Sequence, residues 1–489
     1  MRFCPYYTFS QEKGLQTPRR RAKMNQENTG PNFKPGSETK EDKTMTQTNE
    51  SIHGLMEFLK KSPSAFHAVA NLKQMLLDEG FEELAETNRW TVRPGGRYFT
   101  TRNGSSIIAF RVGTDLSDAG FMVTASHSDS PCFKIKENAE LRVRDHYMQL
   151  NTEGYGGMLC STWLDRPLSI AGRVLVRKQE GERETSESRL INFDRDLVLI
   201  PNVAIHMNRQ ANDGLSYNKQ VDMLPLIGSG EMKTGDFKKL VAAEAGCAVE
   251  DLLGTDLYLY SRTEPTVWGM NREFVSAGRL DDLECAYGNL RGFLRGSNEK
   301  SIQVYACFDN EEVGSGTKQG ADSTFLSDVL YRIVRGLGME DEDYRCMTAR
   351  SFMLSCDNAH AVHPNHPEKT DAINCTYMNE GIVVKAHAGQ KYTSDAVSVA
   401  LFKGICEKAG VPLQYFANRS DAAGGSTLGN IAMAHVSMNT VDLGLAQLAM
   451  HSAFETAGVR DLEYLERAGE AFYSTHLVPD EAGVLRLEA

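Results

Sequence analysis

The sequence predicts an α/β fold, built on a mixed, largely parallel sheet that is flanked by helices. Residues 302–308 and 351–356 are apolar runs of strand length, as expected for strands buried on both faces. Residues 281–294 and 323–337 read as helices and alternate with these strands. Strands that alternate with helices indicate a largely parallel sheet, because each helix carries the chain back to the same end of the sheet.

The N-terminal part of the chain divides into a polar tail and two helices. Residues 1–50 are rich in Asn, Gln, Gly, Pro, Lys, Glu and Thr, so we expect a disordered tail with little to bury. The basic triplet 19–21 is either a solvated part of this tail or a binding patch. Apolar side chains at helical spacing over 52–59 and 66–76 predict that order begins near Ser51.

A second module interrupts the α/β pattern. Short strands are expected over 98–100, 106–112 and 121–125, after which residues 134–262 have a β-rich character of their own. This segment contains expected strands at 168–176 and 197–200, and a charged stretch, 178–189, that reads as an exposed loop. We therefore expect residues 51–133 and 263–489 to form one α/β catalytic domain, into which residues 134–262 are inserted.

Composition narrows the class of protein. The chain has 489 residues, 41% hydrophobic and 24% charged, with a net charge of −12, which argues against binding to nucleic acid. No apolar run approaches the roughly 18 residues of a membrane span, so no membrane association is expected. The ten cysteines lack CxxC pairs and the dense spacing of secreted scaffolds. A reducing, cytoplasmic location is the simplest interpretation.

Three apolar strands run directly into side chains that bind metals. Residues 121–126 precede His127 and Asp129, residues 302–308 precede Glu311 and Glu312, and residues 351–356 lead to the following group, Asp357 and His360. Ligands in open α/β sheets bind beyond the carboxyl ends of the strands. Each carboxylate alone could be a helix cap, but buried neighbouring carboxylates repel one another and need cations to stay together. Jointly they predict a metal site.

The adjacent pair Glu311 and Glu312 suits hydrolysis. Neighbouring side chains at a strand end point in different directions, so one can bind metal while the other faces the substrate. Metal-assisted hydrolysis needs that division, because a metal lowers the pKa of a water and a nearby carboxylate takes the proton.

Two further candidates are ambiguous from the residues alone. Asp281 and Asp282 open the helix predicted at 281–294, where they could act as caps or as a carboxylate that bridges two ions. His451 lies in an apolar segment, 444–452, that reads as a short helix, where a histidine is more often a hydrogen-bonded core residue than a ligand.

Five ordered motifs resemble those of the aspartyl aminopeptidase family, which includes a vacuolar leucine-preferring aminopeptidase. The resemblance extends from about Ser51 to the C-terminus, and the motifs that carry it are Ser126-His127-Ser128-Asp129, Gly278-Arg279-Leu280-Asp281, Asp309-Asn310-Glu311-Glu312, Ser355-Cys356-Asp357-Asn358 and Gln447-Leu448-Ala449-Met450-His451.

The resemblance implies a two-zinc site, in which Co²⁺ or Mn²⁺ could substitute. It implies that His127, Asp281 and Asp357 hold one zinc, and that Asp281 with Glu312 and His451 holds the other. Glu311 would be the general base. Asp129 would hydrogen-bond His127 and fix its tautomer. Asp282 receives no role.

Substrate contacts also follow from the resemblance. They comprise His206 in the inserted module, His360 beside the site, Lys385, Tyr392 and Gly425 in a glycine-rich loop. His206 would reach the active site of a neighbouring subunit. The inserted module would mediate dimerisation, and the dimers would assemble into a dodecamer whose hollow shell admits short peptides.

The expected activity is removal of the N-terminal residue from peptides, with Asp or Glu preferred and neutral residues as the alternative. Two rival functions use the same ligands: a two-zinc carboxypeptidase or deacylase, and a catalytically silent member kept as a shell-forming scaffold. The first would need an Arg arranged for a substrate carboxylate, and none can be placed.

Overall fold

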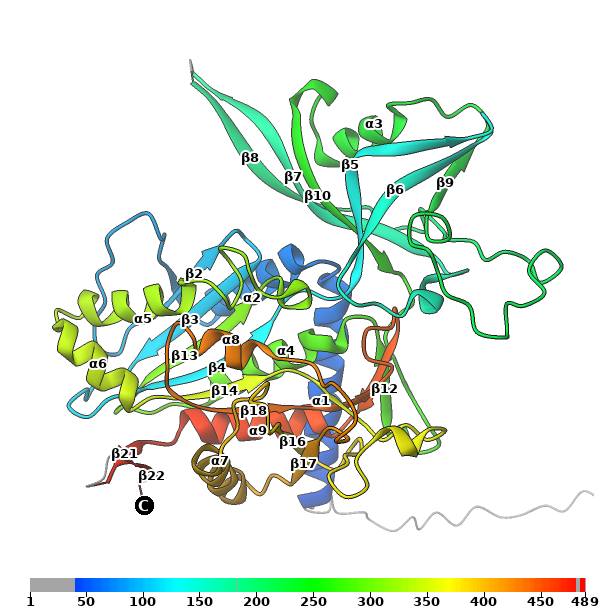
Figure 1. Cartoon of the computed structure of the whole chain (residues 1–489). Helices are drawn as coiled ribbons and strands as arrows, with labels where there is room; N and C mark the ends of the chain where they lie inside the picture. The colour runs from blue at the N-terminus through cyan, green and yellow to red at the C-terminus, as the bar shows by residue number, and fades with distance from the viewer. Residues whose placement is uncertain (1–39, 182, 481–483, 489) are drawn as a thin grey trace, which may run out of the picture. The chain divides into compact units, whose positions relative to one another are not determined.

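The central sheet of the computed structural model has nine strands and is mixed (Figure 1). The structure describes residues 40–181, 183–480 and 484–488, and the chain from Thr44 onward forms one compact unit. The strands of the central sheet, in spatial order, are β1 (Glu82–Glu83), β2 (Arg97–Arg102), β3 (Ser106–Val112), β13 (Ile302–Phe308), β4 (Phe121–His127), β14 (Phe352–Cys356), β18 (Asn439–Gly444), β16 (Ile382–Ala386) and β17 (Leu413–Ala417).

The middle of this sheet is parallel. Strands β13, β4, β14 and β18 pair in parallel in that order, whereas β2–β3, β3–β13 and β16–β18 are antiparallel. The α/β class with a largely parallel sheet is therefore confirmed. Strands β4, β13 and β14 are buried along their whole length, because helices cover both faces.

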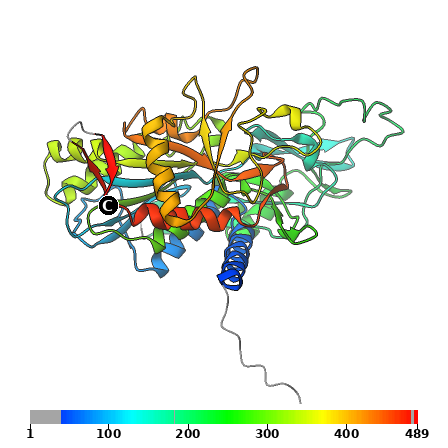
Figure 2. The same ribbon diagram turned by 90° about the horizontal axis from the view of Figure 1, so that it is seen from below.

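Helices cover the two faces of the sheet with separate apolar cores. One core joins Met122 and Tyr305 to the helices α1, α2, α4, α7 and α9; the other joins Val123 and Val304 to α5, α6 and α8. Successive residues of one strand thus enter opposite cores, as the pleat requires. The helices are α1 (Lys40–Lys61), α2 (Ala65–Asp78), α4 (Leu280–Arg295), α5 (Phe325–Gly336), α6 (Asp341–Ala349), α7 (Ala396–Ala409), α8 (Leu428–Ala432) and α9 (Asp461–Tyr473). Helices α7 and α9 contact each other and cross in the view of Figure 2.

Between β4 and β11 in the sequence, the chain forms a separate six-stranded sheet. Its spatial order is β8 (Arg183–Asn192), β7 (Leu168–Glu180), β10 (Leu252–Ser261), β5 (Cys132–Val143), β6 (Tyr147–Tyr155) and β9 (Leu226–Ser229). With α3 (Asp236–Ala245) it encloses a third apolar core, around Phe133 and Leu257. The 3₁₀ turns η1 (Cys160–Trp163) and η2 (Val249–Asp251) belong to the same part of the chain.

Two small sheets complete the described fold. The first contains β11 (Thr266–Trp268), β12 (Phe274–Ala277), β20 (Glu455–Gly458), β19 (Ala446–Leu448) and β15 (Ala359–His360), and the second pairs β21 (Leu477–Pro479) with β22 (Leu485–Leu487). The remaining 3₁₀ turns are η3 (Glu311–Val313) and η4 (Pro367–Lys369). None of the helices in the described ranges combines the length and the apolar character that crossing a membrane requires.

The structure corrects two local predictions. Within the stretch 178–189, predicted as a loop, residues 178–180 belong to β7 and residues 183–189 to β8, and exposed charges of opposite sign pair across the two strands, such as Arg177 and Glu184. Residues 444–452, predicted as a helix, form β19 and a loop, in which His451 has a φ of +66°. Of the predicted tail 1–50, residues 1–39 lie outside the described residues, and α1 begins at Lys40.

Gly444 fixes the spacing between β18 and the residue that follows β14. A Cβ atom at Gly444 would lie 1.9 Å from the carbonyl oxygen of Asp357. Gly444 ends β18, and Asp357 follows β14, which pairs with β18. Neither main chain can therefore move without breaking this pairing. We expect Gly444→Ala to lower the free energy of unfolding by about 1–3 kcal/mol, measured by denaturant titration. Gly254→Ala is the matched control, because a Cβ there meets open space; an equal effect of both variants would contradict the steric account.

Candidate metal centre

The register of the parallel strands gathers polar side chains at one edge of the sheet. His127, the last residue of β4, stands opposite Phe308 at the end of β13, and Ala125 stands opposite Ser355 in β14. The residues that follow these strands therefore leave the sheet at the same level. This explains why Glu311, Glu312 and Asp357 meet His127, although up to 230 residues separate them in the chain.

Asp281 lies between two groups of candidate ligands. Its Oδ1 atom is 3.5 Å from His127 Nε2, which is 3.9 Å from Asp357 Oδ1. Its Oδ2 atom is 3.4 Å from His451 Nε2, which is also 3.4 Å from Glu312 Oε2. The two oxygens of one carboxylate thus face two different imidazoles, so the side chain can bridge two cations.

These residues fit a metal ion. Tetrahedral zinc with bonds of about 2.0–2.1 Å places its ligand atoms roughly 3.3 Å apart, close to the separations around Asp281. Asp281 Oδ1 and Glu312 Oε1 are buried and have no hydrogen-bond partner among the described residues, a costly state for a carboxylate oxygen unless a cation lies beside it. Imidazole and carboxylate together are typical zinc donors.

Burial and mutual repulsion shape the charge of the site. Burial, with the neighbouring Asp281, raises the pKa of Glu312 well above its ordinary value, and burial also raises the pKa of Asp357. Although burial opposes its charge, the neighbouring imidazoles of His127 and His451 lower the pKa of Asp281. The site therefore favours a dication over the protons that would otherwise neutralise it.

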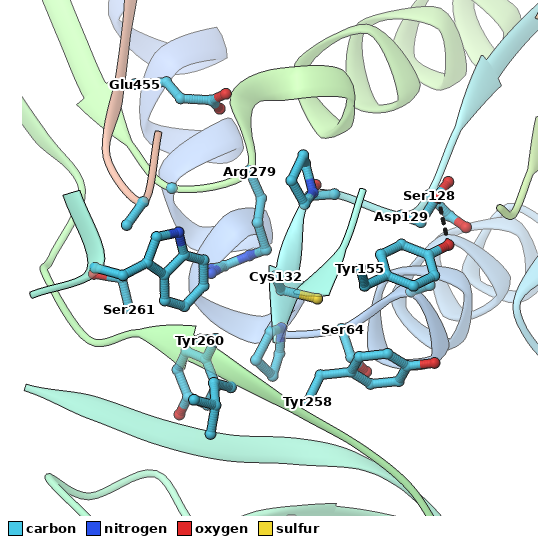
Figure 3. A pocket seen from close by; sticks show the side chains of 18 of the residues that line it. Ser64, Ser128, Asp129, Cys132, Tyr155, Tyr258, Tyr260, Ser261, Arg279 and Glu455 are labelled. Carbon is cyan, nitrogen blue, oxygen red and sulfur yellow. Dashed lines mark hydrogen bonds between the residues drawn. The ribbon is translucent and has the colours of Figure 1, made fainter. Parts of the chain in front are cut away.

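Asp129 holds both the imidazole and the glutamate pair. Its main-chain oxygen is 3.1 Å from His127 Nδ1, so the other ring nitrogen faces the site. Its carboxylate accepts the main-chain N–H groups of Glu311 and Glu312, each at 3.2 Å. Tyr155 donates to the same carboxylate at 2.7 Å, a bond drawn in Figure 3. Asp129 thus orients groups from two strands.

Glu311 lies beside the candidate ligands without joining the Asp281 bridge. It begins η3 and approaches His127 together with Glu312. Burial, with the Asp357, Asp129 and Asp281 carboxylates, raises its pKa to about 8, although His127 lowers it. A carboxylate with such a pKa can accept a proton and return it near neutral pH.

Two carboxylates that received no role from the sequence accept hydrogen bonds from the main chain of the candidate ligands. Asp282 is fully buried and accepts the main-chain N–H of His127 at 3.1 Å. Glu455 accepts the main-chain N–H groups of Asp281 and His451. The only available signal for Asp282 was its place beside Asp281, and the sequence carried none for Glu455.

The predicted substrate residues fall into two groups. Lys385 Nζ is 3.7 Å from Asp357 Oδ2 and 5.5 Å from the ring centre of Tyr392, which places both beside the metal centre. His360 lies in β15, three residues after Asp357, and burial together with Lys385 lowers its pKa. His206 is exposed and has no hydrogen-bond or ion-pair partner in the described part of its own chain. Gly425 is exposed in the loop before α8.

Comparison with known proteins identifies the family. A family model described as aminopeptidase I zinc metalloprotease (M18) matches residues 58–473. A probable M18 family aminopeptidase 2 of Clostridium acetobutylicum is 47% identical over 424 residues, covering 86% of this chain and 98% of the relative. One of Pseudomonas savastanoi pv. phaseolicola is 39% identical over 437 residues, covering 88% and 99%.

Solved structures agree with this assignment. The structure of the Ape4 and Nbr1 complex matches with a TM-score of 0.84 at 34% identity, covering 88% of this chain and 86% of that one. The S. cerevisiae mApe1 dodecamer matches with a TM-score of 0.76 at 26% identity, covering 88% and 97%. The chain belongs to the M18 family of zinc metallo-aminopeptidases, as the sequence motifs predicted, and is a hydrolase.

The raised pKa values predict how the metal-free protein responds to pH. Native Glu311 and Glu455 keep their protons up to a pKa of about 8, whereas in the unfolded chain they lose them near 4.5. The native state therefore binds more protons between these values, and its stability falls as pH rises.

We expect the melting temperature of chelator-treated protein to decrease between pH 5 and pH 8, and added zinc to reduce this decrease. Differential scanning calorimetry with and without zinc measures both effects. A metal-free protein whose melting temperature stays level or rises over this range would contradict the assigned protonation.

Proposed function

We propose that this protein removes single N-terminal residues from peptides, with Asp or Glu preferred, at a centre that holds two zinc ions. The observation that carries the proposal is the position of Asp281, whose two oxygens face separate pairs of candidate ligands. His127, Asp281 and Asp357 would hold one ion, and Asp281, Glu312 and His451 the other. Co²⁺ or Mn²⁺ could replace zinc, because the donors are nitrogen and oxygen.

The residues of the chain have separate tasks in this mechanism. Metal ions held by these residues would lower the pKa of a water and polarise the scissile carbonyl. Glu311 accepts the proton of the attacking water and passes it to the leaving amine. Asp129 keeps His127 and the main chain of Glu311 in place. His360 donates a hydrogen bond to the oxygen of the tetrahedral intermediate.

A cavity next to His360 supports the preference for acidic residues. It has a volume of about 340 Å³, and Gln447 in its wall contacts Asn358, the neighbour of Asp357. Its lining includes Lys369 and Arg419 and, among the residues that the structure describes, contains neither Asp nor Glu. A substrate carboxylate in this cavity would meet the ammonium of Lys369 and the guanidinium of Arg419, which also pairs with Asp421 at the surface.

Lys385 can also contribute to substrate binding. Its ammonium donates to the main-chain oxygen of Asn358 at 3.2 Å and approaches Asp357. An ammonium has three N–H donors, so one is left for substrate. The ring of Tyr392 packs beside it, and Gly425 in the glycine-rich loop allows a peptide to approach the main chain closely.

Assembly belongs to the same proposal. Residues 134–262 would act as a dimerisation domain, and the dimers would form a dodecamer, as the structural relative described as the mApe1 dodecamer does. His206, exposed on this part of the chain, would then complete the site of a neighbouring subunit. All nine cysteines in the described residues are free, which suits the reducing cytoplasm.

The role of Glu311 is tested by replacing each glutamate of the pair. We expect Glu311→Gln to retain its zinc and to lose turnover of an aspartyl nitroanilide by about 10²–10⁴-fold, because only the proton acceptor is removed. Glu312→Gln should lose metal as well as turnover. Atomic absorption and steady-state kinetics measure the two properties, and unchanged kcat in Glu311→Gln would refute the assignment of the base.

The role of the cavity is tested by the ratio of kcat/KM for aspartyl and leucyl substrates. We expect Lys369→Ala and Arg419→Ala each to lower this ratio about tenfold, because each removes a charged hydrogen bond to the substrate. Lys403→Ala on α7, which removes an exposed cation away from the cavity, should leave the ratio unchanged. An equal effect of all three variants would assign the preference to net charge.

A further inference from the structure

Glu455 connects the main chains of two candidate ligands. Its Oε1 atom accepts the N–H of His451 at 2.7 Å, and its Oε2 atom accepts the N–H of Asp281 at 3.1 Å. Only 1% of the residue is exposed, so loss of either bond leaves a buried main-chain N–H without this acceptor. Glu455 and Asp129 are both among the residues that line the cavity drawn in Figure 3.

Strand pairing holds Glu455 in this position. It is the first residue of β20 and stands opposite Ala277, the last residue of β12. Asp281 follows Ala277 by four residues, and His451 precedes Glu455 by four. One carboxylate therefore joins the start of α4, which carries Asp281, to the loop that carries His451.

The other candidate ligands are held without Glu455. Asp129 accepts from the main chain of Glu312 and approaches the ring of His127, and the N–H of Asp357 donates to the main-chain oxygen of Leu443 at 3.0 Å. Among the contacts of the described residues, only Glu455 joins the main chain of Asp281 to that of His451. Its influence should fall on the metal position that these two ligands share.

We propose that Glu455 is a positioning residue, which sets the distance between Asp281 and His451 and thereby the metal affinity of the position that they share with Glu312. The proposal rests on the two-metal centre proposed above. It assigns Glu455 no contact with substrate or metal.

The chemistry of the side chain defines the variants that test this role. Glutamine offers one acceptor oxygen, so in Glu455→Gln the amide NH₂ faces one of the two N–H donors and that bond is lost. Aspartate keeps the charge but is one methylene shorter, so Glu455→Asp can accept from only one of the two main-chain N–H groups. Glu466→Gln is the matched control, because Glu466 is also fully buried yet bonds Ser51 and Arg295 instead of a candidate ligand.

The experiment measures the zinc content and the zinc affinity of the full-length protein, by atomic absorption and by competition with chelators of graded strength. We expect two zinc ions in the wild type and in Glu466→Gln. In Glu455→Gln and Glu455→Asp we expect one ion to be retained and the other to bind 10–100-fold more weakly. Excess zinc should then restore most of kcat with little change in KM.

The outcomes separate this inference from the function on which it rests. A wild type that binds fewer than two zinc ions would overturn the two-metal centre. A wild type with two ions, together with Glu455 variants of unchanged affinity at both positions, would overturn the role of Glu455 alone. If both Glu455 variants lose the native circular dichroism spectrum even at saturating zinc, Glu455 serves the fold, and the proposal fails.

Discussion

The repulsion between buried carboxylates is the constraint around which the catalytic part is organised. At the edge of the sheet the carboxylate of Asp281 lies within 4.8 Å of Asp357 and within 4.8 Å of Glu312, and Glu311 lies equally close to Glu312. Without cations such a group either keeps its protons or pushes the strands apart. The parallel core between β13 and β18 resists separation, because both of its faces are packed against helices. The packed sheet therefore holds the carboxylates together against their mutual repulsion.

Hydrogen bonds from the main chain to three further carboxylates keep the loops around this site in place. Asp129, Asp282 and Glu455 each accept N–H groups from residues that supply ligands or the candidate base. Such bonds fix where a loop runs, while the ligand side chains keep their lone pairs for a metal. The carboxylates that hold the main chain are therefore distinct from the candidate metal ligands.

Much of the site could be predicted from the sequence, because its ligands follow strands that are recognisable by their own composition. His127, Glu312 and Asp357 are local features of this kind. Glu455 could not be found in this way, because its role depends on the pairing of β12 with β20, whose residues Ala277 and Glu455 are far apart in the chain. The segment around His451 was assigned to a helix because it is apolar, whereas residues 446–448 pair as strand β19 and His451 lies in a turn with a positive φ. The hairpin over 178–189 was missed because charges normally indicate a loop, although here they pair across two strands.

The loop that carries His451 has a second set of anchors, in the part of the chain that belongs to the six-stranded sheet. The main-chain oxygen of Gly157 contacts the ring nitrogen Nδ1 at 2.7 Å, Leu159 donates to the oxygen of His451, and Thr162 accepts from Ala453. These residues directly follow β6. A small rotation of that sheet would therefore shift the imidazole of His451. Strain applied to the outer surface of the inserted sheet would thus be felt as a change in the geometry of the catalytic centre.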